Sequence, residues 1–386
     1  MQQDIVFSIF LVFAGATVLA TFALFTRQPV LIAYIALGAI VGPYGIGWIE
    51  HPEQMEEMSH IGIIFLLFLL GLDMQPRALL AVLKQASTVA LLSSLVFFAG
   101  GFGLTLLFGY SQMDAIIIGL AMMFSSTIIG LKLLPTTVLH HKHMGDLMVG
   151  LLLIQDMLAI FTLILLGVLK GEGDMPVWQP FVAVPILAAS CYLIVRFVLL
   201  PLIMLFDRYQ EYLFILAIGW CLACAEAANL IGLTYEIGAF IAGVSLATSP
   251  IAQFMAISLK PLRDFFLVMF FFALGAGVNL AMLSDVAIAA ICLALMVLAL
   301  KPVTFRVLLQ NSSERPELAW DVGFRLGQIS EFSLLIAFVA VESQLMSDKA
   351  SLLIQATAII TFVLSSYIVV FNYPNPIAVS DKLRRD

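Results

Sequence analysis

Long apolar runs separated by short polar loops fill the chain, and this pattern predicts helices that span a membrane. Each run has roughly the 17–25 residues that a helix needs to cross a bilayer. The runs lie at about 5–26, 29–49, 57–74, 86–109, 112–135, 144–169, 178–206, 210–231, 234–249, 262–281, 284–305, 317–343 and 350–372. The sequence therefore predicts an all-α polytopic membrane protein with thirteen transmembrane helices.

Composition agrees with this assignment and excludes a water-soluble domain. Hydrophobic residues make up 62% of the 386 residues and charged residues only 11%, whereas about 25% of the residues of a soluble domain are charged. The four cysteines, Cys191, Cys221, Cys224 and Cys292, all lie in apolar runs. We interpret them as buried packing residues, because they form neither a disulfide framework nor a metal-binding pattern.

Basic residues in the loops predict the orientation of the chain. With the N-terminus outside, the inward loops and the tail contain twelve Lys and Arg residues, whereas the outward loops contain only Lys170 and Lys349. Because positive residues favour the cytoplasmic side, we expect the C-terminus in the cytoplasm. The N-terminal MQQDIVF lacks the basic region of a signal peptide, so the first run is expected to remain as a helix.

Three pairs of similar segments indicate an internal repeat. They are 61–74 with 265–280, 32–43 with 236–250, and 119–134 with 323–338. The members of each pair are seven predicted spans apart, and because seven is odd they enter the membrane from opposite sides. We therefore predict two six-helix repeats of inverted topology, a common plan of secondary transporters. A single transport domain would fill 1–386, with a first half at about 1–170, a linker helix at 178–206 and a second half at about 210–376.

Polar residues interrupt one predicted span in each half at matching positions. Those of the first half are Ser125, Ser126 and Thr127, and those of the second half are Arg325, Gln328, Ser330 and Glu331. Adjacent hydroxyl side chains can bond the nearby backbone and favour a local break of the helix, although hydroxyls also join packed membrane helices. Matching broken helices point to the substrate site of a transporter, so we expect two broken helices that cross there.

The apolar segment LLLIQDMLAIF contains Gln155 and Asp156. An ionised carboxylate at such a depth costs roughly 3 kcal/mol, which favours a functional role for Asp156. One carboxylate beside two helix breaks can hold one proton or one alkali cation but not both, so the two compete. The hydroxyls of Ser125, Ser126 and Thr127, together with the Gln155 amide, are neutral hard oxygens that suit K⁺ or Na⁺. We therefore predict a site for H⁺ and K⁺ (or Na⁺) at Asp156, with these four residues around it.

Three further charged features have competing interpretations. Lys301 is expected either to pair with Asp156 or Glu331 or to extend to the inner membrane surface. For Arg325 we favour an internal ion pair with Glu331 as a support for the site. The HHKH run at 140–143 could sense pH, but we favour a solvated basic loop.

Together these residues and motifs resemble one known family. The stretches IAYIALGAIVGP, IGIIFLLFLLGLDM, FSSTIIG, LIQDMLAI, EIGAFIAG and ISEFSLLIAF are similar to those of the monovalent cation:proton antiporter-2 family, and most of all to its Kef-type potassium:proton antiporters. The resemblance extends from about residue 29 to residue 370. It implies a sodium/proton-antiporter-like fold, a homodimer, and a core domain that moves like an elevator past a scaffold domain. A bacterial inner (plasma) membrane location is also implied.

The residue before the carboxylate carries a further implication of the resemblance. Gln155 before Asp156 matches Kef-type members, whereas members with two adjacent acids tend to be electrogenic, so the resemblance implies electroneutral one-for-one exchange of K⁺ and H⁺. Two features depart from the family pattern: SEF at 330–332 replaces Gly-Glu-Phe, and Arg325 is unexpected. Kef-type proteins usually continue into a cytosolic nucleotide-binding regulatory domain. The sequence ends at DKLRRD without a G-x-G-x-x-G fingerprint, and we expect this domain to be absent.

The predicted function is an electroneutral potassium:proton antiporter that uses alternating access and one carboxylate shared between cation and proton. A sodium:proton antiporter is the first alternative, and a gated potassium channel-like efflux protein is the second, although the sequence contains no TVGYG-type filter. A symporter for an organic solute also remains open. An enzyme is not expected, because an intramembrane aspartyl protease would need a second intramembrane Asp facing Asp156, and Asp73 and Asp321 lie near the membrane edges. Beyond K⁺, H⁺ and membrane lipid, we expect no cofactor and no nucleic-acid partner.

Overall fold

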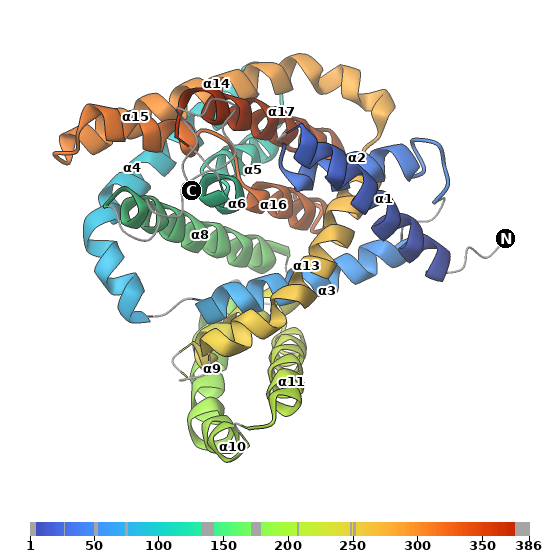
Figure 1. Ribbon diagram of the computed structural model, residues 1–386, viewed down its shortest axis with the longest axis vertical. Helices are drawn as coiled ribbons and strands as arrows, with labels where there is room; N and C mark the ends of the chain where they lie inside the picture. Colours follow the sequence, from blue (N-terminus) through green and yellow to red (C-terminus); the bar gives the residue numbers. More distant parts are fainter. Residues whose placement is uncertain are drawn as a thin grey trace. The chain divides into compact units, whose positions relative to one another are not determined.

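The computed structural model describes residues 5–26, 28–49, 53–73, 76–132, 143–170, 179–206, 208–247, 249 and 252–374. The regular secondary structure of these ranges is entirely helical (Figure 1). The prediction of an all-α chain is therefore confirmed. The tail DKLRRD and residues 140–142 of the HHKH run lie outside the described residues, so the structure does not test the predictions made for them.

Seven of the described helices are long and apolar enough to cross a membrane. They are α1 (Ile5–Phe25), α4 (Pro76–Leu107), α8 (His143–Lys170), α11 (Gln210–Leu230), α14 (Leu283–Asn311), α17 (Asp348–Asn372) and the helix that runs from α9 (Gln179–Ile194) through the π-helical turn η1 (Val195–Leu199) into α10 (Leu200–Leu205). The other described helices are α2 (Val30–Val41), α3 (Glu53–Asp73), α5 (Gln112–Met122), α6 (Thr127–Lys132), α12 (Tyr235–Leu246), α13 (Ala252–Ala276), η2 (Leu280–Met282), α15 (Pro316–Arg325) and α16 (Glu331–Glu342). Some predicted spans thus consist of shorter helices, and the count of thirteen remains a prediction.

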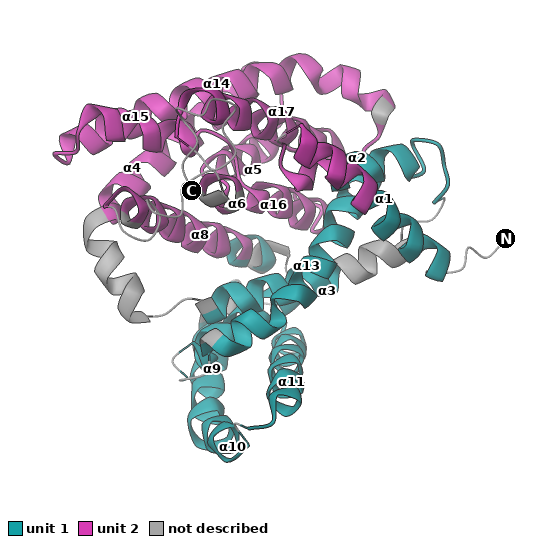
Figure 2. Cartoon of the chain, in the orientation of Figure 1, with its two compact units in different colours: residues 1–16, 34–79, 164–277 teal, residues 17–33, 80–163, 278–386 magenta. Residues whose placement is uncertain are grey.

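The chain forms two compact units, which Figure 2 shows in different colours. Unit 1 contains 1–16, 34–79 and 164–277, and unit 2 contains 17–33, 80–163 and 278–386. Each unit therefore draws segments from both of the halves that the sequence predicts.

Two pairs of helices in unit 1 cross at glycines. Gly38 of α2 lies against Gly275 of α13, and Gly71 of α3 lies against Gly243 of α12. A Cβ atom on any of these four residues would overlap a backbone carbonyl of the facing helix, so the helices approach this closely only because glycine has no side chain. Each crossing joins a predicted span of the first half to one of the second. The two crossings have equivalent positions in the predicted repeat, which itself remains a prediction.

Three cysteines lie in the apolar core of unit 1. Cys191 of α9 and Cys224 of α11 face each other with 3.5 Å between their Sγ atoms, and Cys221 packs in the same cluster. All are free thiols. The prediction that cysteines act as buried packing residues is confirmed for these three, whereas Cys292 of unit 2 is only partly buried.

Unit 2 contains two interrupted helices. The first ends as α5 at Met122 and restarts as α6 at Thr127, and the second ends as α15 at Arg325 and restarts as α16 at Glu331. Both breaks occur at the polar clusters, so both predicted interruptions are confirmed. Within this unit α14 packs against α15 and α17, and α16 packs against α5 and α17, so the interrupted helices and their neighbours form one packed body (Figure 1).

One carboxylate joins the N-termini of two helices in unit 2. Ser111 and Ser347 are the N-cap residues of α5 and α17. Asp114 Oδ1 accepts a hydrogen bond from Ser347 N (2.9 Å), and Asp114 Oδ2 accepts from Ser347 Oγ (3.1 Å) and Ser111 Oγ (2.9 Å). Asp114 thus satisfies donors at the first turn of both helices and fixes where they begin relative to each other.

Candidate functional site

The first break, residues 123–126 between α5 and α6, is built by two fully buried serines. Ser126 Oγ accepts a hydrogen bond from Ile129 N (3.1 Å) and so satisfies one of the N–H groups left unpaired at the start of α6. Ser125 Oγ instead donates to Leu326 O (2.9 Å), in the second break. Ser126 therefore caps the N-terminus of α6, and Ser125 joins the two breaks.

The second break, residues 326–330 between α15 and α16, is capped in the same way. Ser330 Oγ accepts a hydrogen bond from Phe332 N (3.1 Å), and Ser333 Oγ accepts from Ser330 N (3.3 Å). Ser333 Oγ also donates to Ala121 O (2.6 Å) near the end of α5. Ser333 thus bonds the backbone of the first interrupted helix and Ser125 that of the second, so each break depends on the other for its shape.

Lys301 of α14 joins both breaks. Its side chain is fully buried, and Nζ donates hydrogen bonds to Phe124 O (2.5 Å), Ser125 Oγ (3.2 Å) and Gln328 O (3.0 Å). An ammonium group has three N–H donors, and these three neutral acceptors satisfy all of them. Gln328 Nε2 adds a weaker bond to Ser126 O (3.4 Å). The lysine therefore acts as a positively charged bridge between the two unwound segments.

This arrangement corrects both sequence interpretations of Lys301. A side chain with 0% exposure does not extend to the membrane surface. Nor does it form the expected ion pair with Asp156 or Glu331, since its three acceptors among the described residues are neutral oxygens. Aligned carbonyl oxygens compensate the buried charge in place of a carboxylate, which avoids the penalty of an unpaired buried ion.

Asp156 lies on α8 beside the first break. Its side chain is only 4% exposed, and Thr127 Oγ1 lies 3.4 Å from Asp156 Oδ1 and 3.3 Å from Oδ2, so the hydroxyl donates to the carboxylate. Glu331, the first residue of α16, is close enough for its charge to act on Asp156. The positive end of the α16 dipole favours a negative charge at that position. The carboxylate predicted to be functional is thus nearly enclosed and has polar neighbours from both interrupted helices.

Gln155 connects α8 to the first break. Its Oε1 accepts a hydrogen bond from Ser125 N (3.0 Å). Its Nε2 is buried and, among the described residues, has no hydrogen-bond partner. Buried polar groups without a partner are rare. A carbonyl oxygen has two lone pairs, so Oε1 can still accept or coordinate once more.

The five residues predicted to bind the ion divide into two groups. Asp156, Thr127 and Gln155 bring a carboxylate, a hydroxyl and an amide oxygen to the first break, whereas the hydroxyls of Ser125 and Ser126 are bonded to the backbone. Carboxylate and neutral oxygens suit an alkali cation. Within the described part of the chain, no cluster of three or more His, Cys, Asp or Glu side chains could hold a metal ion. Coordination by the full set of five stays a prediction.

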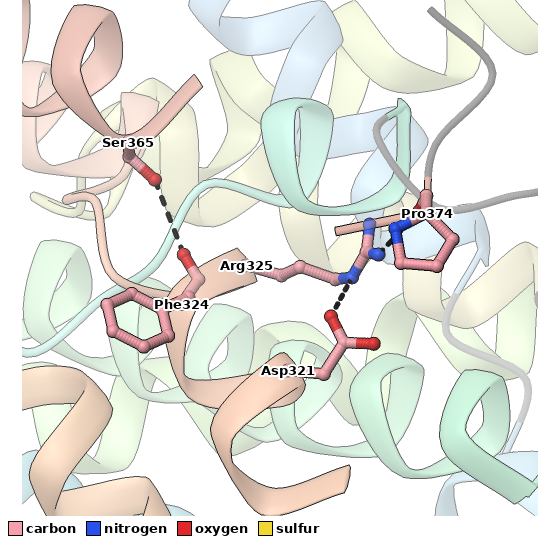
Figure 3. A network of polar contacts seen from close by, with 5 residues as sticks. All are labelled: Asp321, Phe324, Arg325, Ser365 and Pro374. Atoms are coloured by element: carbon pink, nitrogen blue, oxygen red, sulfur yellow. Dashed lines mark hydrogen bonds and ion pairs between the residues drawn. The ribbon is translucent and has the colours of Figure 1, made fainter. Parts of the chain in front are cut away.

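Figure 3 shows the surroundings of Arg325, the last residue of α15. Arg325 Nε donates to Asp321 Oδ1 (2.6 Å), one turn earlier, and Nη2 donates to Pro374 O (2.7 Å), just after the end of α17. Arg325 thus has an acidic partner in Asp321 that the sequence did not predict, and the predicted ion pair with Glu331 stays a prediction. The i,i+4 spacing places Asp321 on the same face of α15 as Arg325.

Sequence reasoning missed a stripe of hydroxyl groups along α17. Thr357, Thr361 and Ser365 follow one another at four-residue spacing and are almost completely buried. Thr361 Oγ1 accepts a hydrogen bond from Ile329 N (3.4 Å), and Ser365 Oγ donates to Gln328 Oε1 (2.8 Å). Polar residues spaced by one helical turn on an otherwise apolar helix are the signal that could have identified α17 as the support of the second break.

His143, the last residue of the HHKH run, is the first residue of α8. Its Nε2 lies 2.7 Å from Glu314 Oε1, in the loop before α15. The side chain of His143 is 59% exposed, as expected of a solvated residue, but His143 belongs to a helix instead of a loop and has an acidic partner.

Known proteins are similar to this chain over most of its length. The family model described as "Sodium/hydrogen exchanger, transmembrane" matches residues 9–371. K(+) efflux antiporter 6 of Arabidopsis thaliana is 28% identical over 352 residues, which cover 87% of this chain and 58% of the relative. The putative cation/proton antiporter YbaL of Escherichia coli (strain K12) is 27% identical over 349 residues, which cover 87% of this chain and 62% of the relative. These matches confirm the resemblance found in the motifs, and the chain spans less than two thirds of the length of these relatives.

A solved structure shares the fold. The sodium proton antiporter MjNhaP1 from Methanocaldococcus jannaschii at pH 8 superimposes with a TM-score of 0.72 at 16% sequence identity, and the match covers 94% of this chain and 95% of that chain. At this identity the likeness concerns the fold alone. It confirms the expectation of a sodium/proton-antiporter-like fold, while the number of spans and the inverted repeat remain predictions.

Proposed function

Because the chain belongs to the family of transmembrane sodium/hydrogen exchangers, which are cation:proton antiporters and not enzymes, we propose that it exchanges K⁺ for H⁺ across the bacterial inner (plasma) membrane. Two features favour K⁺. Relatives of the chain include K(+) efflux antiporters, and Gln155 rather than a second acid precedes Asp156. The curated relatives are longer than this chain, so their activity is transferred here only as part of the proposal.

The observation that carries the proposal is the enclosed carboxylate of Asp156, for which Thr127 is the one hydroxyl donor among the described residues. A buried carboxylate without a compensating charge is unfavourable. It is neutralised either by a proton or by a cation that the neighbouring oxygens help to dehydrate. Occupancy by one ligand removes the charge that the other requires, so the two ligands compete for Asp156.

Charge balance then makes the exchange electroneutral. Asp156 with one proton and Asp156 with one K⁺ carry the same net charge of zero. Lys301 and Glu331 lie in the same unit as Asp156 and move with it in both directions, so they contribute nothing to the net charge per cycle. The site without a ligand carries a bare negative charge and crosses poorly, which enforces one-for-one exchange.

Alternating access is the proposed transport mode, with unit 2 as the moving core and unit 1 as the scaffold. Support comes from the location of the site: both breaks, Lys301 and Asp156 belong to unit 2. The hydrogen bonds between the breaks would keep the site intact during an elevator-like movement. We further propose thirteen spans in two inverted repeats, an external N-terminus, a cytoplasmic C-terminus and a homodimer, for which the sequence patterns and the family resemblance are the support.

A sodium:proton antiporter is the second candidate. The family description names sodium and hydrogen, and the structural neighbour is a sodium proton antiporter. Both candidates use the same carboxylate and differ only in the size and number of oxygens that replace the hydration shell of the ion.

The test is proton flux into proteoliposomes that contain the whole chain. Outward gradients of K⁺, Na⁺ or Li⁺ are imposed with the membrane potential either clamped or free. We expect flux driven by K⁺ that is insensitive to potential. Flux driven only by Na⁺ would mean that Na⁺ and not K⁺ is the substrate. Cation flux without proton coupling would overturn the antiporter proposal in favour of a channel.

A further inference from the structure

Residues of α17 and the segment after it bond both the second break and the end of α15 that precedes it. Thr361 Oγ1 accepts a hydrogen bond from Ile329 N, and the Ser365 hydroxyl donates to Gln328 Oε1 (2.8 Å), with Phe324 O as the more distant acceptor (3.5 Å). Arg325 Nη2 donates to Pro374 O, beyond the end of α17 (Figure 3). The Phe324 ring adds a contact with the Tyr373 ring, at 5.7 Å between centroids. The last three turns of α17 and the residues that follow the helix therefore support the second break.

Arg325 provides the charged contact between the end of α15 and the segment after α17. Its side chain is 1% exposed, and its fork bonds two partners at once: Asp321 Oδ1 through Nε and Pro374 O through Nη2. Asp321 holds the guanidinium in one orientation, and that orientation directs Nη2 at the backbone oxygen of residue 374. A lysine presents a single nitrogen and does not reproduce a planar fork between two fixed acceptors.

Only a few hydrogen bonds separate the Arg325–Pro374 contact from the Asp156 carboxylate. Leu326, the residue after Arg325, supplies the carbonyl that accepts the Ser125 hydroxyl at 2.9 Å. Ser125 N in turn donates to Gln155 Oε1 at 3.0 Å, and Gln155 is the chain neighbour of Asp156. A displacement of the Arg325 backbone therefore alters the first break and the amide beside the carboxylate.

We propose that Arg325 is a positioning residue for the cation site, which fixes the second break against the C-terminal end of α17 so that the backbone position of residue 374 sets the geometry around Asp156. This inference rests on the proposed exchange at Asp156. It adds a point of control outside the site, because Pro374 lies two residues beyond the end of α17. Any contact that shifts this point acts on ion binding through three hydrogen bonds and without touching the ion.

The experiment compares variants of the whole chain in proteoliposomes. Arg325→Gln removes the fork and its charge, Arg325→Lys keeps the charge, and Asp321→Asn keeps an acceptor oxygen but not the ion pair. The matched control is Arg306→Gln, because Arg306 also packs against α15, over the Trp320 ring at 4.7 Å, but has no bond to either break among the described contacts. For each variant the KM for K⁺, the maximal rate and the thermal midpoint are measured.

The proposal predicts that Arg325→Gln raises the KM for K⁺ by about fivefold or more, with a smaller rise for Arg325→Lys and for Asp321→Asn and none for Arg306→Gln. A merely structural role would lower the thermal midpoint and the maximal rate while the KM stays at the wild-type value, and this result would overturn the proposal. If Arg325→Gln does not fold, the two milder variants decide: a raised KM in both supports the proposal, and a wild-type KM in both rejects it. A wild type without cation-driven proton flux would instead be a failure of the proposed function.

Discussion

The Nζ atom of Lys301 lies 2.5 Å from Phe124 O and 3.0 Å from Gln328 O, so a single ammonium group bonds both unwound segments. Carbonyls released by a helix break must be satisfied when they lie away from water. Lys301 satisfies one from each break and also a hydroxyl, Ser125 Oγ. The site beside Asp156 is therefore organised around a positive charge that is already neutralised by dipoles, and not by the transporting carboxylate.

Replacement of Lys301 tests this bridge. Lys301→Met leaves two buried carbonyls without their donor, and each lost partner costs about 1–3 kcal/mol. We expect a lower thermal midpoint and loss of most exchange activity. Lys301→Arg keeps the charge and several donors, and we expect it to retain more stability than Lys301→Met. Melting of the purified variants and proton flux in liposomes measure both effects, and a Met variant with wild-type stability and flux would show that the bridge is dispensable.

Thr127 is the hydroxyl donor of Asp156, and its removal should weaken cation binding. Thr127→Val keeps the shape but not the hydroxyl, and we expect the KM for K⁺ to rise about tenfold, as for the loss of one hydrogen bond to a charged group. Thr127→Ser keeps the hydroxyl and serves as the matched control. Equal KM values for the two variants would mean that Thr127 acts by packing alone.

Gln155 is predicted to keep the exchange insensitive to voltage. Gln155→Glu preserves Oε1 as the acceptor for Ser125 N but places a second carboxylate beside Asp156. Two acids can carry two protons against one cation, so we expect exchange that responds to membrane potential. Flux measured with the potential clamped at several values tests this, and flux that remains independent of potential would contradict the assigned role of the amide.

The Asp114 bridge concerns stability and not transport. Asp114→Ala removes the acceptor for Ser347 N and for two hydroxyls, and loss of a helix cap typically costs about 0.5–2 kcal/mol. We expect a lower thermal midpoint with an unchanged KM for K⁺. Asp285→Ala is the control, since Asp285 also lies in the first turn of a helix but is exposed. A similar loss in both variants would rule out a special role for the bridge.

Hydrophobic runs and two clusters of polar residues were sufficient to predict the all-helical fold and the two breaks, and the same patterns singled out Asp156, whose role stays a prediction. The reason is local. Adjacent hydroxyls such as Ser125 and Ser126 compete with the helix for backbone groups, and an ionised carboxylate in an apolar run is energetically unfavourable. These properties belong to single segments and can be recognised without knowledge of the packing.

The partners of the buried charges could not be predicted in the same way. Lys301 bonds residues 177 and 27 positions away, and whether its nearest oxygen is a carbonyl or a carboxylate depends on how three helices pack. Arg325 has acids at four and six residues, and its contact with Asp321 follows from the helical spacing of α15, which ends at Arg325. The hydroxyls of α17 remained unnoticed because a Thr in an apolar helix can also bond its own backbone, as Thr357 does with Leu353 O (2.7 Å).

Competition between K⁺ and H⁺ at Asp156 is the central claim, and the pH dependence of K⁺ activation measures it most directly. The rate of exchange is recorded against K⁺ concentration at a series of pH values, with the same pH on both sides of the membrane. If one carboxylate binds both ligands, the KM for K⁺ rises in proportion to proton concentration at acidic pH, and Asp156→Asn abolishes exchange while the protein remains folded. A KM for K⁺ that does not change with pH, or an Asn variant that exchanges at the wild-type rate, would contradict the account.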